Sequence, residues 1–258
     1  MTHDDSLFDT FWNEFQGRFE RLPVWMPGTP MKLGDVGMIT SRGWVKETTL
    51  DALDIEIKPD DPGVSSEIDY ASSGVAGTSG AVTRAGVQAP VAAATGDVTY
   101  EFGRAGAFVL RTGETTVHST ADLRGVRQAV LARYQNPSLD WERRWIVVTE
   151  VVTARPVLAL IASEGGARAT LRLRAQAQIS PGLTAGAAPS FDLHHWTGLE
   201  ARLATEDVTV VMWRGHHIVD QILRKPRFDV RGKSEDVGSP GASGTPAFVE
   251  VESPDDVG

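Results

Sequence analysis

The feature that most constrains the fold is an unbroken alternation of apolar and polar residues over positions 167–179. Alanine, leucine and isoleucine occupy every second position, while arginine, threonine and glutamine occupy the positions between them. A period of two predicts a β-strand whose two faces differ. At about 3.3 Å per residue, these 13 residues extend over roughly 43 Å, whereas an ordinary strand has about five or six residues. The stretch therefore predicts an unusually long strand.

A second apolar stretch, residues 145–161, precedes this strand and is separated from it by Ser163, Glu164, Gly165 and Gly166. Two glycines between apolar runs are typical of a hairpin turn, so we expect the two stretches to pair, with a bulge or sheet edge near Pro156. One interpretation is a long hairpin in an ordinary soluble sheet. The other is a strand pair that can refold through a bilayer, which needs about 9 to 11 alternating residues.

A second hairpin region is expected earlier in the chain. Residues 72–95 are mostly Ala, Gly, Ser, Thr and Val, which is typical of either a flexible linker or weakly specified strands. Val98, Tyr100 and Phe102 then alternate with polar residues, and a short apolar run over 107–111 follows. Strands built from small residues rearrange more easily than strands with large side chains.

Helical periodicity predicts two longer helices and one short one. Residues 6–19 place six large apolar side chains on one helical face, and residues 123–134 form an apolar face behind Asp122 as N-cap. A last short helix is expected at 218–223. Together with the strands, these elements predict an α+β fold: a twisted, mostly antiparallel sheet with long hairpins and packed helices.

Composition predicts a soluble protein, and we expect it to be cytoplasmic because residues 1–5 lack the features of a signal peptide. The absence of cysteine excludes disulfides and thiolate metal sites. The net charge of −9 is unevenly placed: residues 1–70 hold 14 acidic and 6 basic residues, residues 71–225 hold 13 and 16, and residues 226–258 hold 7 and 3. The acidic ends either mask the basic middle or serve solubility alone.

The C-terminal part divides into a polar, Gly- and Ser-rich stretch at 232–245, which we expect to be disordered, and an apolar patch at 247–252. The patch contains Phe248, Val249 and Val251. We expect two parts: residues 1–226 as the main domain, and residues 227–258 as a linker and C-terminal tail.

Little in the chain indicates catalysis or nucleic-acid binding. His194 with His195, and His216 with His217, are adjacent pairs, and neighbours on a strand point to opposite faces. A metal site therefore needs one histidine from each pair, with Asp220 or Glu200; otherwise these histidines are structural. Phosphate-loop, dinucleotide and hydrolase motifs are absent, so no cofactor is expected. Arg168, Arg172 and Arg174 form a basic strip without interleaved aromatics, so nucleic-acid binding is not expected.

The order of these elements resembles the pore-forming domain of gasdermins. The resemblance covers roughly residues 6–225, and its most specific part is Trp-Ile-Val-Val-Thr-Glu-Val at 145–151, where the family has a similar aliphatic-Val-Thr-Glu-aliphatic run. The chain departs from bacterial relatives that carry a lipidated N-terminal cysteine, and acidic residues outnumber basic ones on its first helix.

The resemblance implies a latent pore-forming protein of bacterial defence and cell death, with no catalytic residues. A protease would remove the C-terminal tail, and the protein would move from the cytoplasm to anionic lipids of the inner membrane and assemble into a homo-oligomer. The possible cleavage region contains Arg231 and Lys233. The inhibitory contacts would be made by Phe248, Val249 and Val251. The candidate membrane-strand residues are Val98, Tyr100, Phe102, Ala169, Leu171, Leu173, Ala175 and Ala177.

Two other functions remain open from the residues alone. The long strands also fit a non-enzymatic binding or scaffold protein with an ordinary sheet. The third and most distant alternative is a metal-dependent enzyme built on the histidine pairs.

Overall fold

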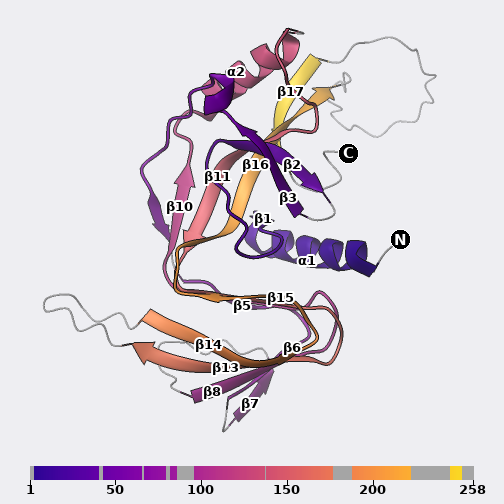
Figure 1. Cartoon of the computed structure of the whole chain (residues 1–258), viewed down its shortest axis with the longest axis vertical. Coiled ribbons are helices and arrows are strands. Elements are labelled where there is room, and N and C mark those ends of the chain that lie inside the picture. Colours follow the sequence, from indigo (N-terminus) through magenta and orange to yellow (C-terminus); the bar gives the residue numbers. More distant parts are fainter. Residues whose placement is uncertain are drawn as a thin grey trace, which may run out of the picture.

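In the part of the chain that the structure describes, the strands form three antiparallel sheets, against which two α-helices pack. The computed structural model describes residues 3–40, 43–65, 67–79, 82–85, 96–136, 138–176, 188–221 and 245–251. Figure 1 shows an elongated molecule with the largest sheet at one end and the two smaller sheets at the other. The predicted fold class, α+β with mostly antiparallel strands, is confirmed.

The eight-stranded sheet is built around two long central strands, β11 and β16, which pair from Ile146 with His217 to Ala154 with Thr209. Its strands are β1 (Leu22–Pro23), β2 (Asp35–Thr40), β3 (Gly43–Thr49), β4 (Gly63–Ser65), β10 (Thr115–Ser119), β11 (Ile146–Ala154), β16 (Thr209–Gln221) and β17 (Thr245–Glu250). A 3₁₀ turn, η1 (Asp51–Leu53), follows β3.

Each face of this sheet is covered by one helix. The aromatic stripe of α1 (His3–Phe19) shares a core with alternate β11 residues such as Ile146 and Val148. The helix α2 (Leu123–Gln135) packs Val126 and Val130 with Val147 on the opposite face. Both predicted helices are confirmed, and the Asp122 side chain accepts a 2.7 Å hydrogen bond from the Gly125 amide, as expected of an N-cap.

The two smaller sheets stack face to face. The four-stranded sheet contains β5 (Asp69–Ala71), β9 (Phe108–Thr112), β12 (Val157–Ala162) and β15 (Leu199–Thr205). The five-stranded sheet contains β6 (Val75–Ser79), β7 (Val82–Ala85), β8 (Gly96–Phe102), β13 (Ala167–Gln176) and β14 (Ala188–Thr197). Leu158 and Leu160 of the first sheet share a core with Tyr100, Phe102 and Leu171 of the second.

The predicted pairing across Gly165 and Gly166 is wrong. The stretch 145–161 divides into β11 and β12, which belong to different sheets, and β12 pairs with β9 and β15 while β13 pairs with β8 and β14. The chain therefore crosses from one stacked sheet to the other at 163–166 rather than turning back within a sheet. In the second expected hairpin region, β6 pairs antiparallel with β7 and with β8, but β8 and β9 do not pair because they lie in different sheets.

Long antiparallel pairs are present, but with other partners. The ten-residue strands β13 and β14 pair from Arg168 with Thr197 to Gln176 with Ala188. The short helix expected at 218–223 is also wrong, because residues 218–221 continue β16, and residues 222–223 lie outside the described part. Isoleucine and valine at 218 and 219 favour the strand.

Candidate functional site

The strongest candidate site is the five-stranded sheet, whose central strands have one apolar and one polar face. Ala167, Ala169 and Leu171 of β13 lie in register with Phe102, Tyr100 and Val98 of β8. All six belong to the core between the stacked sheets; Val98 is partly buried and the others are buried. Because neighbours in register share a face, the two strands present one continuous apolar surface.

The opposite face of the same two strands is polar. Arg168 pairs with Glu101 at 3.0 Å, Arg172 pairs with Asp97 at 3.1 Å, and the hydroxyls of Thr99 and Thr170 lie 3.1 Å apart. Both ion pairs are about half exposed, so each contributes little to stability. The acidic partners neutralise the charges of Arg168 and Arg172, so this face attracts an anionic partner less strongly. The structure does not describe the side chain of Arg174.

The apolar face is covered by an interface that is rich in small side chains. Four of its ten buried residues are alanines, namely Ala107, Ala162, Ala167 and Ala169. Small side chains bury less apolar area, so separating these two sheets costs less than separating sheets packed by leucines.

One buried charge lies in this interface. Arg111 of β9 is 4% exposed, its Nε lies 2.8 Å from Asp69 Oδ1, and its guanidinium lies 5.5 Å from the centre of the Tyr100 ring. Burial raises the pKa of Tyr100 to about 12, and burial also raises the pKa of Asp69 although Arg111 opposes that change. A buried ion pair stabilises an interface less than apolar side chains of the same volume do. No pattern in the sequence indicates this pair.

The second candidate site is the position of β17 on the eight-stranded sheet. It pairs antiparallel with β16, from His216 opposite Glu250 to Gln221 opposite Thr245, and Val251 N donates a 2.8 Å bond to Gly215 O. Phe248 is 4% exposed in the core beneath α2, whereas Val251 is 2% exposed in the core that contains α1. The C-terminal patch therefore contributes to the cores on both faces of the sheet.

The other predicted tail and strand residues are only partly described. Val249 lies in β17, and Leu173 and Ala175 lie in β13, but their side chains are outside the description. Ala177, Arg231 and Lys233 lie outside the described residues altogether.

His216 is a titratable side chain that lies against β17. Its ring stacks on Phe248 with centroids 5.2 Å apart, and its Nδ1 lies 3.0 Å from Thr149 Oγ1. Burial, followed by the positive charges of Arg214 and Arg127 and by His217, lowers the pKa of His216 from 6.5 to about 4. The folded state therefore favours the neutral ring, and this stability is complete above pH 6.5 and lost as pH falls from 6.5 toward 4.

We expect acidification from pH 7 to pH 5 to lower the free energy of unfolding by about 1 to 2 kcal/mol through His216, allowing for solvent around its partly exposed ring. Urea unfolding at the two pH values measures the difference. His216→Gln should remove most of this pH dependence, whereas His194→Gln, on an exposed strand position, should retain it. An unchanged pH dependence in His216→Gln would contradict the assignment.

The histidine pairs do not form the alternative metal site. One pair lies on β14 and the other on β16, in different sheets. Among the described residues, no group of three or more His, Asp or Glu side chains is arranged to hold a metal ion.

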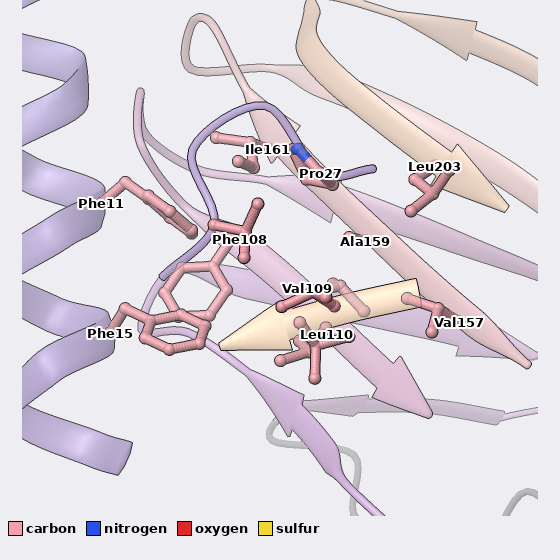
Figure 2. A pocket seen from close by; sticks show the side chains of 13 residues that line it. Phe11, Phe15, Pro27, Phe108, Val109, Leu110, Val157, Ala159, Ile161 and Leu203 are labelled. Carbon is pink, nitrogen blue, oxygen red and sulfur yellow. The ribbon is translucent and has the colours of Figure 1, made fainter. Parts of the chain in front are cut away.

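A cavity lies between α1 and the β-sheets, and its lining is apolar. Figure 2 shows Phe11 and Phe15 of α1 beside Phe108, Leu110 and other residues of this lining. Its volume is ≈ 20 Å³, enough for about one water molecule, and apolar cavities of this kind stay dry. It is a packing defect rather than a substrate site.

Comparisons with known proteins add little to this geometry. No protein-family model and no curated protein matches the chain. Among solved structures, the chain is similar to the cryo-EM structure of the Gasdermin A3 membrane pore, with 13% identity, 84% of this chain and 90% of that chain covered, and a TM-score of 0.32. A likeness at that TM-score carries no weight for function. In the described part of the chain, neither helix has the length and apolar character needed to cross a bilayer.

Proposed function

We propose that the protein is a latent pore-forming protein, in which strands of the five-stranded sheet become membrane strands after β17 is released. The observation that carries the proposal is the shared register of β8 and β13. Over six paired positions, apolar residues share one face and charged or hydroxyl-bearing residues share the other. A strand that lies between lipid and a watery lumen needs this division of its faces.

Strand length is the next support. The strands β13 and β14 have ten residues each, and a tilted strand crosses a bilayer with about 9 to 11. In the resting state, the four-stranded sheet covers the apolar face. Pore formation exchanges this cover for lipid, so the apolar surface stays out of water in both states.

Latency is assigned to β17, which acts from a distance. It lies at the opposite end of the molecule from β7, β8 and β13 (Figure 1), so it cannot act by covering the membrane strands. It instead covers the edge of β16 over His216–Gln221, beyond the two positions that β1 covers. Removing it leaves an unpaired strand edge and opens both cores of the eight-stranded sheet, and an open edge readily pairs with another chain.

In this proposal the protein is not an enzyme. Its partners are an activating protease, anionic membrane lipids and further copies of the same chain. It moves from the cytoplasm to the inner membrane after cleavage. Residues 1–226 are the pore-forming part, and residues 227–258 are the linker and the inhibitory tail.

Proteolysis in the linker tests the proposal. We expect a chain cut at a protease site introduced beside Gly232 to release dye from liposomes containing phosphatidylglycerol, raising release from background to near completion. The uncut chain should release none, because β17 remains paired with β16. If the cut chain loses β17 and is as inert as the uncut chain, the protein is an ordinary sheet protein that binds or scaffolds rather than a pore former.

A further inference from the structure

The five-stranded sheet, which contains the proposed membrane strands, is joined to the rest of the protein by four chain crossings. The crossings lie at residues 72–74, 103–107, 163–166 and 198, each between the four-stranded and the five-stranded sheet. We call them the crossover row. In the described part of the chain, the backbone passes between these two sheets only at this row. The sheets therefore cannot separate unless the backbone of the row changes its conformation.

Hydrogen bonds join the crossings side by side. Gly103 N donates to Gly74 O at 2.7 Å, Gly166 N donates to Phe102 O at 2.7 Å, and Ser163 N donates to Gly198 O at 2.9 Å. Gly74 and Gly166 have φ values of +86° and +88°, which only glycine adopts readily. The row is thus a narrow band of backbone that can serve as a hinge.

The helix α1 is fastened to this row by one carboxylate. Glu14 forms an ion pair with Arg104 of the second crossing, and it accepts a 2.9 Å hydrogen bond from the Ser73 amide of the first crossing. The Ser73 and Tyr70 hydroxyls each lie 3.5 Å from the same carboxylate. Arg104 in turn donates to Ser73 O at 3.2 Å and to Ser73 Oγ at 3.0 Å.

A second contact of α1 lies one helical turn earlier. A Cβ added to Gly106 would lie 2.8 Å from the Thr10 methyl, so the helix presses directly on the second crossing. Thr10 and Glu14 are four residues apart and share a helical face. Neither Thr10 nor Glu14 belongs to the buried core that the aromatic residues of α1 fill.

We propose that Glu14 is the latch of the crossover row: it holds two of the four crossings against α1 and so sets how fast the stacked sheets separate. This inference rests on the proposed function, because it regulates release of the same strands. It also makes α1, and not only β17, a control point. β17 pairs within the eight-stranded sheet, whereas Glu14 contacts the crossover row directly.

Hydrogen exchange in the uncut chain tests the latch without any membrane. Glu14→Gln keeps the shape of the side chain but removes its charge, so we expect the amides of Gly103, Gly106 and Gly166 to exchange about tenfold faster, as for loss of one charge-assisted bond at a partly exposed site. The amides of β11 should be unchanged. Asp9→Asn is the matched control, since Asp9 is an exposed acid on the same helix. Arg104→Gln should raise the same exchange rates at least as much as Glu14→Gln, because it also removes the bonds from Arg104 to Ser73.

Dye release by the cut chain is the second arm. With vesicles of phosphatidylethanolamine and phosphatidylglycerol, cut Glu14→Gln should release dye several-fold faster than the cut parent, and cut Asp9→Asn should match the parent. Crossing amides that exchange in Glu14→Gln as they do in Asp9→Asn would overturn the latch. Absence of release from the cut parent would instead overturn the pore function, and the exchange rates would still decide the role of Glu14.

Discussion

Phe248→Ala is expected to make the uncut chain permeabilise liposomes without any protease. Truncating a buried phenylalanine costs about 3 to 5 kcal/mol. Burial of Phe248 and Val251 contributes only about 3 to 6 kcal/mol to the docking of β17, from which the cost of ordering the segment must be subtracted. The substitution therefore removes most of the free energy that keeps β17 on β16, and dye release should approach that of the cut chain.

Leu50→Ala is the matched control for this prediction. Leu50 is fully buried in the same core as Phe248, and its truncation costs about 2 to 5 kcal/mol, but it lies outside β17. We expect this variant to unfold at a lower temperature and to stay inert toward liposomes. Exchange of the Val251 amide, which bonds to Gly215, reports whether β17 has left. A Phe248→Ala chain that has lost β17 and remains inert, while the cut chain is active, would contradict inhibition by β17.

Local periodicity in the sequence was sufficient to predict three of the longest elements. The alternation over 167–179 predicted β13 with its two faces, the aromatic stripe predicted α1, and Asp122 predicted the start of α2. Each of these patterns is set by residues close in sequence and by the geometry of a single strand or helix. Most of the apolar patch expected after the glycine-rich stretch lies in β17.

The partners of those strands could not be predicted from the same patterns. A period of two shows which residues share a face, but a strand stacked on another sheet has the same period as a strand paired within one. The turn at Gly165 and Gly166 fits both arrangements, and for this reason β12 and β13 were expected to pair although they stack. The nearly continuous apolar character of β12 does reflect burial on both faces, since all six of its residues are buried.

The contacts at the hinge have no counterpart in sequence patterns. Glu14 and Arg104 are 90 residues apart, and Ser73 lies 59 residues from Glu14. On α1, Glu14 has the spacing of an ordinary solvent-facing acid beside the aromatic stripe. Only the three-dimensional arrangement brings it to the crossings.

The second large effect is expected at Leu173 of β13. In the proposed membrane strand, alternation assigns Leu173 to the lipid face with Ala169 and Leu171, and Arg174 to the watery lumen. A charge on the lipid face near the middle of the bilayer costs about 2 to 4 kcal/mol, and an oligomer repeats that cost in every copy. Leu173→Asp should therefore abolish dye release by the cut chain, whereas Arg174→Gln on the same strand should leave it nearly unchanged.

Thermal unfolding of the uncut variants separates this effect from a folding defect. Leu173→Asp must unfold near the temperature of the parent chain before its inactivity counts, and Ala175→Asp, on the same face, serves in its place if Leu173→Asp does not fold. Cutting must also release β17 from each variant to the same extent as from the parent.

Dye release by the cut Leu173→Asp and Arg174→Gln chains, measured side by side on the same liposomes, is the most direct test of whether this strand enters the membrane. The proposed function predicts background release for Leu173→Asp and near-parental release for Arg174→Gln. Full release by a well-folded, cut Leu173→Asp chain would show that β13 does not cross the bilayer with this face toward lipid.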